Sequence, residues 1–241
     1  MKVSLIIPMY NESLIVSDAV KTFSEYMVSS FEDFELIFVD DGSTDDCGAA
    51  VLAAHEKDAR IRLVSYQPNR GKGYAVRAGV AAAEGDLIAF TDCDNAYGEQ
   101  AVGRLFATLE ESGADIVVGS RNLTKDGYAG YTFIRKLASK TYLKLIGVMA
   151  GFKLSDSQCG CKAFTRETVW EIFPRCEVNG FAFDFEAILW ATKLGKVIVE
   201  TPVKIINHRE SKVNVFKDTF KMLKDLSRMK KRIKKIEIEI K

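Results

Sequence analysis

Short apolar runs alternate along the first half of the chain with longer segments in which apolar residues recur every three or four positions. The short runs predict strands at 3–7, 35–39, 61–65, 87–91 and 116–119. The longer segments predict helices at 13–28 and 99–112, and an alanine-rich helix that follows 69–73 and ends at Gly85. Strands that are apolar throughout and separated by helices are typical of a parallel sheet covered on both faces.

The second half of the chain has a less regular pattern. Residues 131–152 predict an amphipathic helix, 155–167 a loop leading into a strand, 185–194 a helix and 196–203 an extended segment. From residue 216 to the end, apolar residues recur every three or four positions among ten Lys or Arg and four Asp or Glu. This pattern predicts a basic amphipathic helix. We therefore expect one domain over 1–212 and a basic amphipathic helix over 213–241.

Composition narrows the class of protein. The 241 residues are 47% hydrophobic, enough for one large core, and the net charge of +1 argues against general nucleic-acid binding. The five cysteines lack CxxC spacing, which predicts reduced thiols rather than a disulfide framework or a zinc site. The apolar N-terminal run is too short for a signal peptide, and the sequence predicts no transmembrane helix.

Polar residues gather where the predicted strands end. These strand ends carry residues 8–12, 40–43, 69–73, 92–95 and 119–121. Polar residues are ordinary in any one such loop. Because ligands of open parallel sheets bind beyond the carboxyl ends of the strands, all five together favour a ligand site at one edge.

The chemistry of this edge suits a nucleotide joined to a sugar by a diphosphate. Asp92 and Asp94 follow a buried strand, where carboxylates are costly unless they are paired or bound to a cation. Their hard oxygen atoms suit Mg²⁺ or Mn²⁺. Lys72 and Arg121 would add positive charge near the phosphates, while an aromatic ring and a carboxylate can hold a base.

Several motifs carry a family resemblance. Together, "SLIIPMYNES", "ELIFVDDGSTD", "NRGKGYAVRAG", "GDLIAFTDCDN" and "IVVGSR" resemble the nucleotide-sugar-binding half of a family 2 glycosyltransferase. The later segments "SDSQCGCKAF", "FAFDFEAI" and "ESKVN" resemble polyprenyl-phosphate glycosyltransferases, the dolichyl-phosphate glucosyltransferases more than the mannose synthases. The resemblance implies an inverting α/β enzyme with a single A-type domain, built on a mainly parallel, Rossmann-like sheet.

The resemblance also implies roles for particular residues. It assigns the metal to Asp92 and Asp94 and a catalytic role to both of them and to Arg121. It places the nucleotide sugar against Pro8, Tyr10, Glu12, Val39, Asp41, Lys72, Asp92, Cys93 and Asp94. Ala96 stands where mannose synthases have a glutamine, which favours UDP-glucose as the donor over GDP-mannose. Cys93 is either a soft extra ligand or, as we expect, a small side chain that points into the sheet.

The acceptor raises the question of a general base. A lipid phosphate is already anionic, so it can attack the sugar without one, and its candidate partners are Arg135, Arg209 and Lys212. The resemblance places Asp184 and Glu186 near where the family keeps a base for hydroxyl acceptors, and the glucosyltransferase-like members also have an aspartate there. Two interpretations stay open for Asp184: a catalytic or sugar-binding group, or the N-cap of the following helix.

We therefore expect metal-dependent, inverting transfer of glucose from UDP-glucose to a membrane polyprenyl phosphate, in cell-envelope glycan synthesis. Transfer to a hydroxyl of a polysaccharide or lipid-linked glycan is the first alternative, and a non-catalytic nucleotide-sugar-binding module is the second. The basic helix either lies on an anionic membrane or packs against protein. The expected location is the cytoplasmic face of the membrane, as a peripheral protein, with a membrane-protein partner or a homo-oligomer left open.

Overall fold

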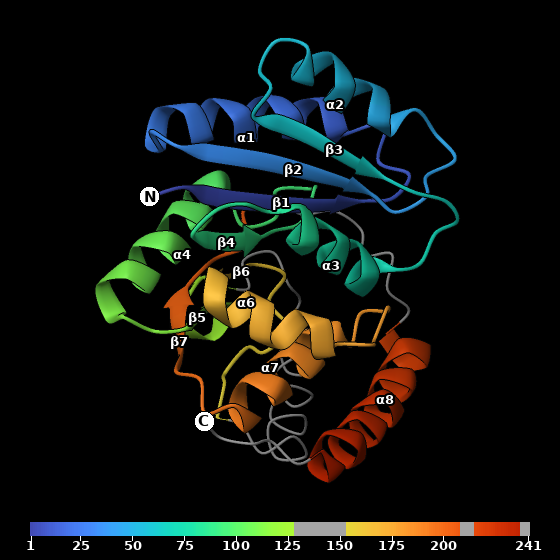
Figure 1. The fold of residues 1–241 in the computed structure, drawn as a ribbon, viewed down its shortest axis with the longest axis vertical. Coiled ribbons are helices and arrows are strands. Elements are labelled where there is room, and N and C mark those ends of the chain that lie inside the picture. Colours follow the sequence, from blue (N-terminus) through green and yellow to red (C-terminus); the bar gives the residue numbers. More distant parts are fainter. Residues whose placement is uncertain (128–152, 208–214, 237–241) are drawn as a thin grey trace.

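The fold is built on one twisted sheet. A computed structural model describes residues 1–127, 153–207 and 215–236, with the backbone alone for 215–224. Within these residues seven strands form the sheet in the order β3-β2-β1-β4-β6-β5-β7 (Figure 1). Their bounds are β1 (Val3–Met9), β2 (Phe34–Asp40), β3 (Ile61–Ser65), β4 (Leu87–Phe90), β5 (Ile116–Ser120), β6 (Lys162–Thr165) and β7 (Ile198–Pro202).

The sheet is mainly parallel, as the sequence predicts. Strand β1 pairs in parallel with β2 and β4, β2 with β3, and β5 with β7. Strand β6 is the exception, because it runs antiparallel between β4 and β5. The buried faces of β1, β2 and β4 explain why these strands have continuous apolar runs.

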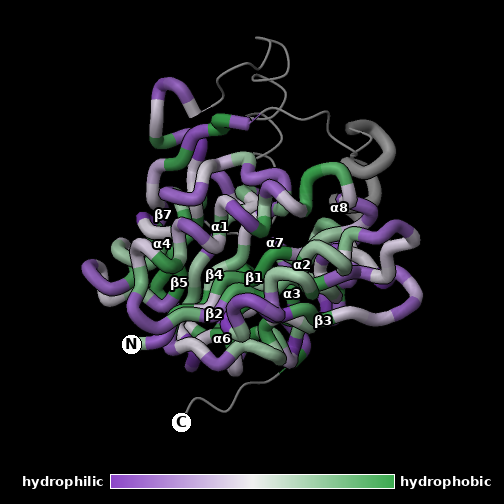
Figure 2. The backbone as a smooth tube through the Cα atoms, turned by 90° about the horizontal axis from the view of Figure 1, so that it is seen from above, coloured by the Kyte–Doolittle hydropathy of each residue, from purple (hydrophilic) through white to green (hydrophobic). Residues whose placement is uncertain are grey.

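Helices cover both faces of the sheet and divide the core in two. Their bounds are α1 (Val16–Ser30), α2 (Cys47–His55), α3 (Lys72–Ala82), α4 (Glu99–Ser112), α6 (Arg166–Ile172), α7 (Phe183–Lys193) and α8 (Val215–Lys235), with short 3₁₀ turns η1 (Arg121–Leu123) and η2 (Phe173–Arg175). One core layer contains residues of α1, α2 and α4, and the other contains residues of α3, α6, α7 and α8. The backbone is accordingly coloured as hydrophobic along the central strands β1 and β4 (Figure 2).

The five strands predicted in the first half of the chain are confirmed, with small changes at their ends. The first helix starts later than predicted because Ile15 and Val16 donate backbone hydrogen bonds to the Glu12 carbonyl, forming a turn ahead of α1. Helix α6 is an element that the apolar pattern did not predict. The helix predicted at 131–152 lies outside the described residues.

The C-terminal helix packs against the domain along its described apolar positions. Leu226, Met229 and Ile233 are buried and belong to the same core layer as α7. For these three residues the protein-packing alternative is therefore correct, and their side chains are not available to a membrane. The predicted boundary at residue 212 lies outside the described residues.

The cysteines and the lengths of the helices agree with the sequence pattern. All five cysteines are free and buried, as predicted for reduced thiols. Across the described ranges, the helices are too short or too polar to cross a bilayer.

Helix α3 lies unusually close to the sheet at Gly79. A Cβ atom at this position would stand 2.4 Å from Ile6 Cγ2 and 3.0 Å from Val39 Cγ2, both in the core. By contrast, a Cβ atom on Gly48, in α2, would stand 3.4 Å from its nearest neighbour, Leu63 Cδ2. The close approach at Gly79 fixes the distance of α3 from the strands whose ends form the site described below.

These two glycines predict opposite effects of the same substitution. Gly79→Ala should lower the free energy of unfolding by about 1–3 kcal/mol, because the new methyl group overpacks the core. Gly48→Ala should raise it by roughly 0.5 kcal/mol, because alanine loses less conformational entropy in a helix. Urea unfolding of both variants beside the wild-type protein measures the two changes. Equal stability of the two variants would contradict the close approach of α3.

Candidate active site

The candidate site lies at the edge of the sheet where β1, β2, β4 and β5 end. Because β6 is antiparallel, its first residue, Lys162, reaches this same edge and pairs in register with Phe90, the last residue of β4. The predicted strand-end residues therefore meet at one edge, as expected for a sheet of this kind. The antiparallel strand adds a lysine to this edge that the strand-end pattern did not predict.

Asp92 and Asp94 follow β4, and a lysine contacts the first of them. Lys72, the first residue of α3, donates a hydrogen bond from Nζ to Asp92 Oδ1. Although burial opposes it, the charges of Asp92 and Asp184 raise the pKa of Lys72 and keep it cationic. Burial, together with the negative charge of Asp92, raises the pKa of Asp94. The two carboxylates thus repel each other, and a nearby cation is favourable.

The donor set fits a divalent cation that is shared with a substrate. Asp92 and Asp94 supply hard carboxylate oxygens, which suit Mg²⁺ or Mn²⁺. Within the ranges that the structure describes, no three Cys, His, Asp or Glu side chains are grouped closely enough to hold a metal ion. Mg²⁺ typically uses one or two carboxylates and completes its shell with water and substrate phosphates. Two carboxylates beside a lysine therefore match a metal bound together with a phosphorylated ligand.

Two of the predicted ligand-binding residues contribute their side chains to the core. Cys93 is 6% exposed and packs among apolar residues, and burial and then the charge of Glu12 raise the pKa of its thiol. The expected inward-pointing side chain is therefore what the structure has. Val39 is fully buried in β2 and packs on the α3 side of the sheet. Any contact of Val39 with a ligand would involve its main chain.

The segment after β1 carries the other residues predicted to bind the base. Pro8 lies in β1 opposite Val39, and Tyr10 is 41% exposed just beyond the strand. The pKa of Asp94 is raised by burial and by the charge of Asp92, and the nearby charge of Glu12 raises it further. These residues border the same edge of the sheet as Asp92 and Asp94.

Asp41 holds the loop that leads into α3. Its buried carboxylate accepts hydrogen bonds from Tyr66 Oη at 2.8 Å and from Asn69 Nδ2 at 2.9 Å. It also accepts from the backbone N–H groups of Arg70 and Gly71, each at 2.8 Å. The sequence predicted Asp41 as a nucleotide ligand. The structure adds a second role, because these hydrogen bonds fix the position from which α3 and Lys72 begin.

Asp184 forms a buried ion pair with Lys162. Lys162 Nζ lies 2.6 Å from Asp184 Oδ1 and 2.6 Å from the Cys159 carbonyl oxygen, and its side chain is fully buried. Helix α7 starts at Phe183 with Ala182 as its N-cap, so the N-cap interpretation of Asp184 is wrong. Burial raises the pKa of Asp184 against the opposing effects of Lys162 and Lys72. The signal that could have identified Lys162 is a lysine at the start of a short strand that continues into Ala163 and Phe164, because a lysine buried there needs a partner.

Arg121 is fixed by a second buried carboxylate. Its guanidinium group binds both oxygens of Asp156, with Nε at 2.6 Å and Nη2 at 2.7 Å, and its backbone N–H also donates to Asp156. Glu200 on β7 in turn accepts a hydrogen bond from the Asp156 N–H at 3.0 Å. The guanidinium group is therefore held at the end of β5 by a bidentate pair. Arg135, Arg209 and Lys212 lie outside the described residues.

Comparison with known proteins shows the family to which the chain belongs. Residues 4–173 match the model of the glycosyl transferase family 2. The chain is 32% identical over 239 residues to a dolichyl-phosphate beta-glucosyltransferase of Dictyostelium discoideum, covering 94% of this chain and 73% of that protein. It is 31% identical over 231 residues to a dodecaprenyl-phosphate galacturonate synthase of Rhizobium johnstonii, covering 94% of this chain and 65% of that protein.

The fold also has a counterpart among solved structures. Glucosyl-3-phosphoglycerate synthase from Mycobacterium tuberculosis, crystallised with Mn²⁺, UDP and phosphoglyceric acid, superposes with a TM-score of 0.68 at 22% identity. The match covers 96% of this chain and 75% of that chain. The family and the A-type fold expected from the motifs are thus confirmed.

The Lys162–Asp184 pair predicts a strong energetic coupling. Lys162→Met and Asp184→Leu should each lower the free energy of unfolding by about 3–5 kcal/mol, because each leaves one buried charge without its partner. The double variant should be more stable than either single variant, since it removes both charges.

Urea unfolding of the three variants measures this coupling. The exposed pair of Lys2 and Glu84, with an N–O distance of 2.8 Å, provides the control. Glu84→Gln should lower the free energy of unfolding by less than about 1 kcal/mol. Additive losses in the double variant would show that the two buried side chains do not depend on each other.

Proposed function

The chain belongs to the glycosyl transferase family 2 and is a glycosyltransferase, and we propose that it transfers a hexose with inversion from a nucleotide sugar to a polyprenyl phosphate. The names of its relatives support this acceptor, because both the Dictyostelium and the Rhizobium protein are named for a sugar joined to a polyprenyl-type phosphate. The observation that carries the proposal is the buried Lys162–Asp184 pair at the site.

The pair supports an acceptor that needs no general base. A hydroxyl acceptor must lose a proton to a group within hydrogen-bond reach. Asp184, the residue at the family's base position, is instead buried and bound to Lys162. A phosphate acceptor is already anionic, so its oxygen can form the bond to the sugar C1 while the bond from C1 to the diphosphate breaks. The nucleoside diphosphate leaves with the bonding electrons, and no proton has to be moved.

The remaining site residues would bind and orient the donor. Asp92 and Asp94 would hold Mg²⁺ or Mn²⁺, which when bound neutralises charge on the diphosphate. Lys72 would place a second positive charge beside the phosphates, and Arg121 would add a third. Tyr10 and its neighbours in the loop after β1 would contact the nucleoside, with Pro8, Glu12, Asp41 and the main chain of Val39 around it.

UDP-glucose is the proposed donor. Ala96 cannot act as the additional metal ligand expected of a mannose synthase, and the Dictyostelium relative is named as a glucosyltransferase. Mn²⁺ and UDP occur together in the solved structure of the same fold described above. The Rhizobium relative is named for galacturonate, so UDP-galacturonate is the competing donor to compare.

We also propose that the protein works at a membrane surface, because a polyprenyl phosphate is held there by its hydrocarbon chain. The described end of α8 carries exposed cations that suit an anionic surface, while its apolar residues pack inward. The contact would therefore be mainly electrostatic and would weaken as salt is added.

The direct test offers labelled UDP-glucose with two acceptors side by side, a polyprenyl phosphate and the same polyprenol with a free hydroxyl. The proposal predicts transfer to the phosphate only, with loss of at least about a hundredfold in Asp94→Ala because a donor ligand is removed. It also predicts that Asp184→Asn retains more activity than Asp94→Ala, because no proton has to be taken up.

Each other outcome favours a different function. Transfer to the free hydroxyl, abolished by Asp184→Asn, would favour an enzyme with a general base at this position. Binding of the nucleotide sugar with no transfer to either acceptor would favour a non-catalytic binding module.

A further inference from the structure

One arginine of the basic helix α8 reaches a carboxylate in the interior of the domain. Arg232 forms ion pairs with Glu177 and with Glu186 on α7, and it donates a hydrogen bond to the Arg175 carbonyl oxygen at 3.2 Å. Glu186 is fully buried, whereas the side chain of Glu177 is 73% exposed. The charge of Arg232 therefore compensates a carboxylate in the interior, and this contact differs in kind from a surface ion pair.

The same carboxylate also holds the backbone of the loop that begins at Glu177, whose exposed side chain Arg232 contacts directly. Glu186 Oε2 accepts hydrogen bonds from the backbone N–H groups of Glu177 at 2.8 Å and Val178 at 2.7 Å. Arg232 binds its other oxygen, Oε1. Glu186 thus joins α8 to the start of residues 177–180, which we call the 177–180 loop.

The 177–180 loop lies against the first turn of α3. The Gly73 N–H donates to the Asn179 carbonyl oxygen at 2.7 Å, and Arg77 on α3 donates to the Val178 carbonyl oxygen at 2.7 Å. A Cβ atom on Gly71 would stand 2.6 Å from the Asn179 oxygen, and one on Gly73 would stand 2.4 Å from the Val178 oxygen. The loop and the helix start are therefore packed so closely that they cannot move independently by much.

We propose that Arg232 is a positioning residue for the donor site, acting through Glu186 and the 177–180 loop on the first turn of α3. Lys72, which contacts Asp92, stands between the two glycines that touch this loop. Asp41 fixes the approach to α3 from the other side, through the N–H groups of Arg70 and Gly71. The inference rests on the proposed function only in assigning Lys72 to the donor phosphates.

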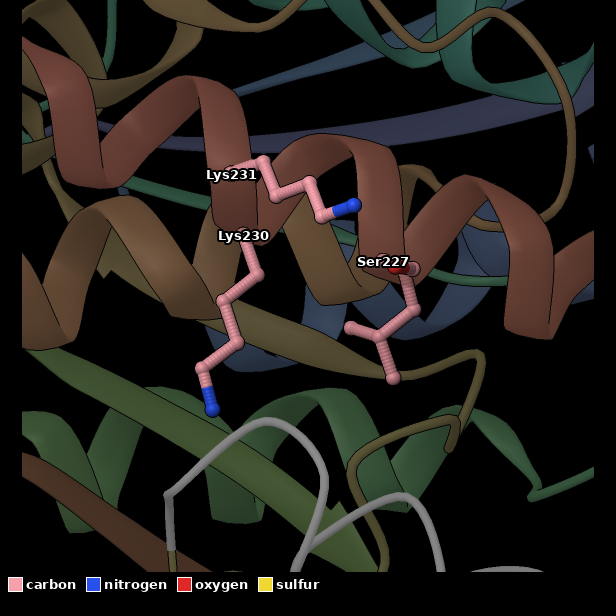
Figure 3. Close-up of a pocket in the computed structure, with 4 residues that line it drawn as sticks. Ser227, Lys230 and Lys231 are labelled. Atoms are coloured by element: carbon pink, nitrogen blue, oxygen red, sulfur yellow. The ribbon is translucent and has the colours of Figure 1, made fainter.

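The other described cations of α8 lie elsewhere on the helix. Lys230 and Lys231 line a pocket together with Leu226 and Ser227, and Figure 3 shows both lysine side chains extending from the helix there. Arg228 is exposed. Arg232 therefore joins the helix to the interior, and Arg228 provides a matched control of the same residue type, one turn away.

The test measures hydrogen exchange at the Gly73 amide, which reports the contact between the 177–180 loop and α3 directly. Arg232→Ala should speed this exchange by about twofold to thirtyfold, the range expected for residues that couple sites without touching a ligand. Arg228→Ala should leave it unchanged. Arg232→Lys should give an intermediate rate, because a lysine can reach Glu186 without forming the forked contact of the guanidinium group.

Steady-state kinetics of the full chain provide a second measurement. Arg232→Ala should raise the KM for the nucleotide sugar by a similar factor and leave the KM for the acceptor unchanged. A loss of folded protein alone would lower kcat and leave both KM values as they were. If Arg232→Ala does not fold, the same comparison is made between Arg232→Lys and Arg228→Ala.

Gly73 exchange that is equal in the folded Arg232 and Arg228 variants would overturn the proposal. Because this exchange needs neither substrate, the result is independent of the proposed reaction. If Arg232→Ala speeds the Gly73 exchange but the enzyme uses a different donor or acceptor, the positioning role of Arg232 is supported and only the proposed function is refuted.

Discussion

A carboxylate that is buried in a protein needs hydrogen bonds or a cation to replace the water it has lost. Among the residues that the structure describes, six carboxylates are buried, those of Glu35, Asp40, Asp41, Asp156, Asp184 and Glu186. Each one ties together segments that are distant or irregular in the chain, as Asp41 does for the loop before α3 and Glu186 for the 177–180 loop. The geometry of the candidate site depends on this set of compensated charges.

The acidic residues of the site therefore divide into two groups. Asp41, Asp156 and Asp184 are bound to several N–H donors, an arginine or a lysine, and they position loops and side chains. Asp92 accepts one hydrogen bond from Lys72, and Asp94 has a raised pKa because of burial and the charge of Asp92. A divalent cation would relieve this repulsion, and diphosphate oxygens would complete its coordination shell. The first group holds the loops and side chains at the edge of the sheet, with Asp41 beside the proposed nucleoside, and the second is suited to hold a cation.

Much of this arrangement could be predicted from the sequence, and the reasons for the rest are physical. Apolar runs and strand-end motifs predicted the strands and the convergence of Asp92, Asp94, Lys72 and Arg121, because the carboxyl ends of parallel strands share an edge. The partners Lys162, Asp156 and Arg232 were not predicted. Each forms its ion pair across 22 to 46 residues of chain. Local periodicity carries no information about such long-range pairs. The sequence alone therefore could not show whether Asp184 is the N-cap of the following helix or has another role.

The central claim is that the edge beyond β4 binds a nucleoside diphosphate together with a divalent cation. Calorimetric titration of UDP, with and without Mn²⁺, on the wild-type protein and on Asp94→Ala tests it most directly, with GDP as the comparison nucleotide. The account predicts binding of UDP that requires Mn²⁺, is weaker for GDP and is lost in the folded Asp94→Ala variant. Binding of UDP that is equally tight without the metal, or unaffected by Asp94→Ala, would contradict it.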